Sequence, residues 1–323
     1  MVYQVKAGIL GLEDLGRAYA QLLKYHIKDL NLIGGVGKTQ KELLFAKNDL
    51  SLQYVYSDDR SLLENHDIDA IFIFSELSQR PHLAIKAIEA GKHVFIADPI
   101  AMNYEDAYSL YKSADSRPSQ VVMASSLPRF QPLINEVKTL VEKGELGIIN
   151  HITIDSSFFK GLNRTYSKAS GSPFLDSAVD EIDFCLWLMD EPIELVKVSA
   201  NNYTIICDGM TRKSTSFSII VHSDFHKEQS YLNIYGTKGQ IILSNTNHKA
   251  FKLFKENGEK VDIYKDEANG FQFSEYLQLH HFARAVLGYE KAKVNTIHAK
   301  NLVQIAVALE KARALEQSIK LNN

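Results

Sequence analysis

The alternation of strand-like and helix-like segments over the first 125 residues is the feature that most constrains the fold of this chain. Apolar runs of strand length recur there at short intervals: Val2–Leu10, Leu30–Val36, Gln53–Tyr56, Asp69–Phe74, His93–Ala97 and Val121–Ser125. Segments with helical spacing separate them, as between Pro81 and Ala90. Strands that alternate with crossover helices indicate a parallel sheet with right-handed connections. We therefore predict a doubly wound α/β domain of the Rossmann type over residues 1–125.

The regular alternation of strand-like and helix-like segments ends in the second part of the chain. Helical spacing is found from Pro132 to Lys143 and from Phe174 to Met189, and Ile149–Phe159 is a long β-rich run. Between Ile193 and Tyr264 several strand-like runs follow one another with short connections, which favours a mainly antiparallel sheet. We expect an α+β domain over residues 126–323 with a large sheet for substrate binding and oligomerisation. Its closing helix, 299–318, is expected to pack back across the domain interface.

Composition excludes several classes of protein. The 323 residues carry a net charge of −3, so no basic surface for nucleic acid is expected. The longest apolar stretches are far too short to span a membrane, and the N-terminus lacks the regions of a signal peptide, so we expect a cytoplasmic protein. Cys185 and Cys207 are far apart and show no metal-binding spacing, which predicts two buried thiols and no metal site.

Seven motifs occur in an order that is typical of one family: Gly8–Gly16, Ala90–Pro99, Arg129–Pro132, Gly144–Gly147, Gly171–Asp183, Gly236–Gly239 and Phe273–Gly288. In these motifs the chain resembles the Gfo/Idh/MocA oxidoreductases, which include glucose–fructose oxidoreductase and inositol dehydrogenase. The resemblance implies NAD or NADP as cofactor and a sugar, a polyol or a related carbonyl compound as substrate. It also implies a homo-oligomer, a dimer or a tetramer, formed through the outer face of the second domain's sheet.

The first motif departs from the dinucleotide-binding pattern at one position. That pattern has three glycines between strand and helix, and Gly11 and Gly16 fill the first and third places while Glu13 fills the second. A unit charge about 4 Å from a phosphate costs roughly 4 kcal/mol at an effective dielectric constant near 20. Alternatively, carboxylates in the first turn stabilise the helix by ~0.3–1 kcal/mol, so that it needs no phosphate. The resemblance places the cofactor on Gly11, Leu12, Glu13, Asp14 and Leu15.

Three further segments are implied in cofactor binding. The second strand of a dinucleotide-binding domain ends in an acidic residue that binds the adenosine ribose, whereas Gly37 and Lys38 follow the strand here. Lys38 either favours the 2′-phosphate of NADP or is a solvated lysine at a helix entry. The resemblance also places Ser75 and Arg80, the latter instead of the family's histidine, near the cofactor, together with Pro99.

The positions that carry the family's chemistry hold carboxylates. Asp98 replaces the lysine of the family's Glu-Lys-Pro motif, and an ionised carboxylate would oppose a developing alkoxide. In the family's Asp-x-x-x-His pattern, Asp176 matches the aspartate and Asp180 replaces the histidine. Asp176, Asp180 and Asp183 share one helix face. They form either an acidic cleft, in which they raise each other's pKa, or a solvated face opposite the core.

These assignments give a candidate site and three hypotheses. The candidate catalytic residues are Asp98, Asp176 and Asp180, and the candidate substrate-binding residues are Arg129, Lys160 and Arg164. The first hypothesis is a diverged NAD(P)-dependent oxidoreductase in which an aspartate acts as general base. The second is a non-catalytic relative, a ligand sensor or partner-binding protein, which would explain why several functional positions depart together. The third is that the aspartates bind a divalent metal or an amine-bearing ligand.

Overall fold

The structure is a computed structural model of the chain. It describes residues 4–155, 172, 174, 175, 178–201, 204–222, 231–244, 250–264 and 271–321. The chain forms two compact units, the first made of Met1–Ser126 and Glu275–Val303 and the second of Leu127–Ser274 and Gln304–Asn323. The domain limits 1–125 and 126–323 stay a prediction.

A parallel sheet forms the centre of the first unit. In the described part of the chain its strands are β1 (Val5–Leu10), β2 (Leu30–Val36), β3 (Tyr54–Tyr56), β4 (Ala70–Ile73), β5 (His93–Ile96) and β6 (Val122–Ala124). Their spatial order is β3-β2-β1-β4-β5-β6, and each described pair is parallel. The sequences of β1, β2 and β4 are almost continuously apolar because helices cover both faces of such a sheet. The predicted doubly wound fold is confirmed.

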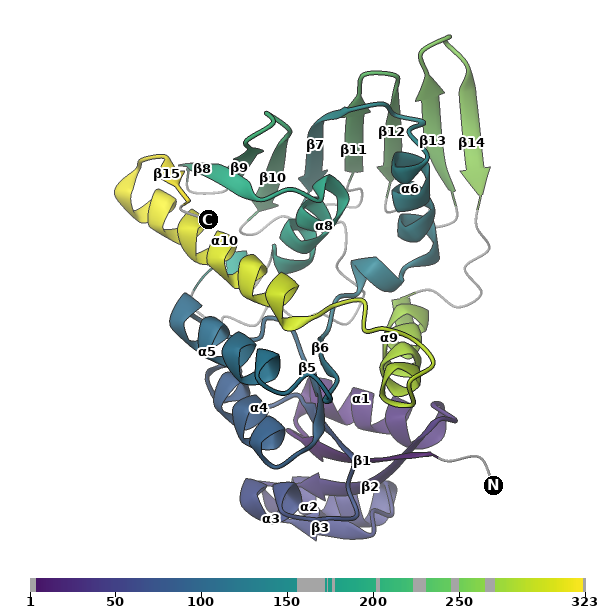
Figure 1. Cartoon of the computed structure of the whole chain (residues 1–323), viewed down its shortest axis with the longest axis vertical. Helices are drawn as coiled ribbons and strands as arrows, with labels where there is room; N and C mark the ends of the chain where they lie inside the picture. Colours follow the sequence, from purple (N-terminus) through teal and green to yellow (C-terminus); the bar gives the residue numbers. More distant parts are fainter. Residues whose placement is uncertain are drawn as a thin grey trace. The chain divides into compact units, whose positions relative to one another are not determined.

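Helices connect these strands and cover the sheet. They are α1 (Asp14–Tyr25), α2 (Gln40–Leu44) with the π-helical turn η1 (Phe45–Asp49), α3 (Asp59–Leu63), the 3-10 turn η2 (Leu77–Gln79), α4 (Arg80–Glu89) and α5 (Tyr104–Asp115). A later helix, α9 (Phe271–Val286), also belongs largely to this unit (Figure 1). Its Phe282 meets Phe72 of β4 and Phe95 of β5 edge-on, with ring centroids 5.2 and 5.6 Å apart. Thus a helix from the far end of the sequence completes the core of the first unit.

A nine-stranded sheet organises the described part of the second unit. Its strands are β7 (Ile149–Asp155), β8 (Ile193–Ala200), β9 (Thr204–Thr211), β10 (Ser216–His222), β11 (Tyr231–Gly236), β12 (Gly239–Ser244), β13 (Ala250–Lys255), β14 (Lys260–Tyr264) and β15 (Ile319–Lys320). Neighbouring strands are antiparallel except β7 and β10. This confirms the expectation of a mainly antiparallel sheet.

In the described residues, the helical segments that accompany this sheet include the 3-10 turn η3 (Pro128–Phe130), α6 (Pro132–Glu142), α8 (Val179–Met189) and α10 (Thr296–Leu315). Figure 1 shows α6 and α8 on the same side of the strands. Most residues of α8 are buried, including Phe184 and Leu188, because this helix lies on the core face of the sheet. None of the helices in the part of the chain that the structure describes combines the length and the apolar character that a membrane span requires.

Two polar side chains at the start of β5, the buried Lys92 and the half-buried His93, hold this strand to its neighbours. Lys92 is 6% exposed, and its ammonium donates hydrogen bonds to the carbonyl oxygens of Asn65 and Ile68 at 2.7 and 2.8 Å. His93 accepts the N–H of Val121 at Nδ1, at 2.9 Å. Burial lowers the pKa of His93, and the charge of Asp69 offsets part of this shift. The neutral imidazole is therefore the form that the fold prefers.

The preference for neutral His93 predicts a pH dependence of stability. A histidine whose pKa is lower in the folded state stabilises the fold fully above its unfolded value, about 6.5. That stability is lost as the pH falls from there through the lowered folded value, because the unfolded chain binds the proton first. We expect His93→Asn, whose Oδ1 replaces Nδ1 as the acceptor, to lose less stability than the wild type between pH 7.5 and 5. Thermal melting at a series of pH values tests this, and parallel curves for the two proteins would contradict it.

Candidate active site

The turn from β1 into α1 has the backbone shape of a phosphate-binding turn. Gly11 has φ +90°, and a Cβ there would lie 2.5 Å from the nitrogen of Ser75. A Cβ on Gly16 would overlap the carbonyl oxygen of Gly11. Both positions therefore require glycine, the first for the turn and the second for the close packing of helix on strand. The turn lies where the order of the strands reverses, between β1 and β4, which is the usual ligand site of such sheets.

Glu13 begins α1 without capping it. Its side chain is exposed and forms no capping hydrogen bond, and the following Asp14 and Leu15 are exposed as well, whereas Leu12 is buried. This carboxylate therefore does not cap the first-turn N–H groups, while Asp14 places an acidic side chain in the first turn, so the alternative in which these carboxylates stabilise the helix through its dipole stays open. A 12-residue helix with such a start attracts an anion through its N–H groups and its dipole. The backbone of this turn has the shape that accommodates a pyrophosphate, and Glu13 places a negative charge in the same turn.

A capping box, which was not among the sequence predictions, begins α2 shortly after β2. Thr39 is the N-cap of α2 and accepts the N–H of Glu42. In return, the Glu42 carboxylate accepts the N–H of Lys38 at 2.9 Å and the hydroxyl of Thr39 at 2.8 Å. The signal was present in the sequence, because Thr-x-x-Glu before an apolar run is a capping-box pattern.

Arg80 connects the loops that follow β4 and β5. Its Nε donates to the carbonyl oxygen of Ser75 at 2.9 Å, and its Nη1 donates to those of Pro99 at 2.9 Å and Ala97 at 3.4 Å. Half-buried Asp98 lies between these last two residues, and the Asp98–Pro99 peptide is cis. The structure thus brings Ser75, Arg80 and Pro99 together at the carboxyl ends of neighbouring strands.

The acidic residues of α8 are buried. Asp180, Glu181 and Asp183 are 3%, 1% and 3% exposed, so the interpretation as a solvated acidic face is wrong. The reason is that α8 lies on the core face of the sheet, where its polar residues are covered together with its apolar ones. Asp176, Lys160 and Arg164 lie outside the described residues, so their predicted roles stay predictions.

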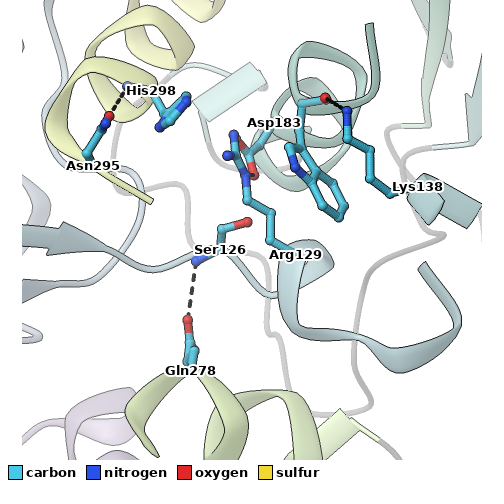
Figure 2. A network of polar contacts seen from close by, with 8 residues as sticks. Ser126, Arg129, Lys138, Asp183, Gln278, Asn295 and His298 are labelled. Atoms are coloured by element: carbon cyan, nitrogen blue, oxygen red, sulfur yellow. Dashed lines mark hydrogen bonds and ion pairs between the residues drawn. The ribbon is translucent and has the colours of Figure 1, made fainter. Parts of the chain in front are cut away.

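Arg129 holds α8 against the chain that precedes α6. Its Nε and Nη2 donate to the two carboxylate oxygens of Asp183 at 2.9 and 2.5 Å, and both side chains are about as buried as core residues (Figure 2). The guanidinium also lies 5.7 Å from the ring of Trp187. A bidentate pair in such a place fixes the orientation of the helix that carries Asp180. The structure gives Arg129 a positioning role, and its substrate contact stays a prediction.

Gln278 of α9 makes a second set of buried polar contacts, which no pattern in the sequence predicts. It is 0% exposed, its Nε2 donates to the hydroxyl of Tyr19 at 2.9 Å, and its Oε1 accepts the hydroxyl of Ser125 at 3.0 Å and the N–H of Ser126 at 3.2 Å. Figure 2 shows the contact with Ser126. One side chain thus joins α9 and α1 to the residues that follow β6. A single glutamine in a helix has no spacing that would reveal this.

The two cysteines and the carboxylates give no metal centre within the described residues. Cys185 and Cys207 are free and buried, as predicted, and burial raises the pKa of both thiols, which makes them unreactive. No cluster of three or more histidine, cysteine, aspartate or glutamate side chains in that part of the chain could hold a metal ion. The aspartate cluster proposed from the sequence includes Asp176, which lies outside this part.

A parallel sheet with a glycine turn at its switch point defines a dinucleotide-binding protein of the Rossmann class. The sequence profile of an oxidoreductase family with an NAD-binding Rossmann fold matches residues 5–125, and that family's C-terminal alpha/beta domain matches residues 138–321. The chain therefore belongs to the Gfo/Idh/MocA oxidoreductase family.

Individual relatives agree with this assignment over nearly the whole chain. The chain is 24% identical to scyllo-inositol 2-dehydrogenase (NAD(+)) of Bacillus subtilis (strain 168), covering 95% of this chain and 94% of that protein. It is 23% identical to myo-inositol 2-dehydrogenase of Thermotoga maritima, covering 98% of each.

Solved structures share the fold. Scyllo-inositol dehydrogenase from Lactobacillus casei with bound NAD(H) and scyllo-inositol has a TM-score of 0.81 at 22% identity, covering 98% of this chain and 99% of that one. Levoglucosan dehydrogenase in complex with NADH and levoglucosan has a TM-score of 0.85 at 16% identity, covering 99% and 100%.

The Arg129–Asp183 pair gives a prediction for stability. Removing one partner leaves a buried charge, so Arg129→Met or Asp183→Asn should each lower the free energy of unfolding by about 3–5 kcal/mol. The double variant Arg129→Met/Asp183→Asn should lose clearly less than the sum of the two, because no charge is left unpaired. Denaturant unfolding measures all three. Additive losses would show that the two side chains act independently.

Glu13 gives a prediction for affinity. Glu13→Gln should tighten the binding of NADH and NADPH alike, by up to about tenfold at low salt, because it removes a negative charge near the pyrophosphate. The gain should shrink as salt screens the charge. Glu89→Gln at the exposed end of α4 is the matched control and should change neither affinity. Titration by nicotinamide fluorescence decides the matter, and unchanged affinity in Glu13→Gln would show that the carboxylate points away from the cofactor.

Proposed function

We propose that this chain is a nicotinamide-dinucleotide-dependent dehydrogenase that acts on a polyol or a closely related sugar. The observation that carries the proposal is the turn from Gly11 to Gly16, whose backbone fits a pyrophosphate although Glu13 departs from the family pattern. Membership of an oxidoreductase family with an NAD-binding domain supports the cofactor. The full-length relatives that are inositol dehydrogenases support a cyclic polyol as the substrate class.

In this proposal, one set of residues binds the dinucleotide and another set transfers the proton. Gly11, Leu12 and Leu15, with the first turn of α1, would hold the pyrophosphate, and Ser75 and Pro99 would shape the loops beside it. When bound, the dinucleotide supplies the carbon that accepts the hydride. Arg80 holds these two loops together through its hydrogen bonds to three carbonyl oxygens.

Carboxylates take the proton in this proposal. Asp180 occupies the place of the family's histidine, and a positioned carboxylate can remove the proton of a reacting hydroxyl. Asp98, in the place of the family's lysine, would orient the substrate by accepting the hydrogen bond of a neighbouring hydroxyl of the polyol, and Asp176 lies four residues before Asp180 in the sequence. Lys160 and Arg164 are the cations that we propose near the substrate. The alternative of a non-catalytic ligand sensor is not favoured by relatives whose names are those of dehydrogenases.

The second unit supports a homo-oligomer as part of this proposal. Ile206 and Met210 of β9 and Tyr231 and Tyr235 of β11 are exposed. They alternate with buried residues such as Cys207, so they lie on the sheet face opposite the core. Large exposed side chains on one face of a sheet suit contact with a second copy. We propose that the protein is a dimer or a tetramer in the cytoplasm. Light scattering of the purified protein tests the oligomeric state.

Substitution of Asp180 tests the proposed chemistry. In a screen of inositols and sugars with either dinucleotide, we expect turnover with at least one polyol. Asp180→Asn should lower kcat by about 10²- to 10⁴-fold, the usual contribution of a general base, while dinucleotide affinity stays unchanged. Asp190→Asn, at the exposed end of the same helix, is the matched control and should keep full activity. Unchanged kcat in Asp180→Asn would remove this residue from the mechanism, and failure of both dinucleotides to bind would overturn the proposed function.

A further inference from the structure

We infer that the segment after β2 selects the phosphorylated dinucleotide, NADP(H), and that Lys38 contacts its 2′-phosphate. The inference rests on the proposed function, because it requires that a nicotinamide dinucleotide binds at all. In folds of this class the adenosine ribose lies beside the residues that follow the second strand, where a carboxylate selects NAD and a cation accommodates NADP. The choice therefore depends on which charge the chain places after Val36.

No carboxylate can occupy the first position after β2 in this backbone. A Cβ on Gly37 would lie 2.7 Å from the nitrogen of Leu43 and 3.0 Å from the carbonyl carbon of Glu42. Both atoms belong to the backbone of α2, so they can move aside only if the whole helix shifts. The close approach of α2 to Gly37 thus excludes the acidic side chain that would bind the ribose hydroxyls.

The carboxylate that follows Gly37 in the sequence is already engaged. Glu42 is the only acidic residue between Val36 and Asn48 in the sequence. It is 7% exposed, and its two oxygens accept hydrogen bonds from the N–H of Lys38 and the hydroxyl of Thr39. To bind a ribose it would have to break the capping box that begins α2. Glu42 is therefore not available to bind the ribose hydroxyls.

Lys38 supplies a cation at this position. Lys38 is exposed, and the hydrogen bond from its own N–H to Glu42 fixes the backbone from which its side chain extends. Among the residues that the structure describes, no hydrogen bond or ion pair engages its ammonium group. Arg17 of α1 lies over the ring of Phe45, directly after α2, at 4.3 Å. A lysine on a hydrogen-bonded backbone, with no carboxylate at the preceding Gly37, is suited to a phosphate dianion rather than to a pair of hydroxyls.

Binding titrations with matched lysine variants test the inference. For the wild type we expect NADPH to bind at least about tenfold more tightly than NADH, the size of one charge-assisted hydrogen bond. Lys38→Gln should lose most of this preference by weakening NADPH alone. Lys41→Gln, at an exposed lysine three residues further on in α2, is the control for net charge and should preserve this preference. The fragments 2′,5′-ADP and 5′-AMP should show the same difference, which isolates the adenosine half from the effect of Glu13.

The outcomes separate this inference from the proposed function. If NADH binds as tightly as NADPH or more tightly, the inference is overturned while the proposed function stands. If Lys38→Gln weakens NADH and NADPH equally, or if Lys41→Gln has the same effect as Lys38→Gln, the assignment of Lys38 is overturned. If neither dinucleotide binds, both fail. A wild-type preference for NADPH that falls with rising salt, together with an unchanged melting temperature of Lys38→Gln, supports the contact.

Discussion

The close packing of α1 on the end of β1 is the constraint on which the first unit depends. No side chain separates Gly16 from the carbonyl oxygen of Gly11, so the helix begins directly above the strand and its first N–H groups face the switch point of the sheet. The backbone of Ser75 approaches the same turn from β4. Three segments therefore meet around one pair of glycines. The site keeps its shape although the residue between them, Glu13, carries the charge that a phosphate would avoid.

The fold was predictable from the sequence because its signals are periodic and local. Alternation of apolar runs with helical spacing indicated the parallel sheet, and short connections after Ile193 indicated the antiparallel one. The bounds of the predicted helix before Met189 agree with α8 only in its second part, and its first part extends into positions outside the described residues. Burial of Asp180 and Asp183 could not be read from spacing, since i, i+4 and i+7 define a face of a helix but not what covers it.

The part of the candidate site that is formed by backbone was predictable from the sequence. Glycine, serine and proline positions after β1, β4 and β5 lie together because strand order alone brings the ends of neighbouring strands to one edge. Side-chain partners were not predictable in this way. The pairing of Arg129 with Asp183 joins residues 54 positions apart, and Gln278 meets Tyr19 across 259 positions. Such contacts depend on packing between helices, for which a single sequence holds no periodic signal.

Arg80 gives the first unit a mechanical property as well as a shape. Its guanidinium holds carbonyl oxygens from the loop after β4 and from the loop after β5. Two loops that share one rigid, planar donor cannot rearrange separately, so a substitution that moves one loop also shifts the other. Directed changes of substrate range that target only one of these loops would therefore alter the other as well, and libraries that vary the two loops together match the way this protein is built.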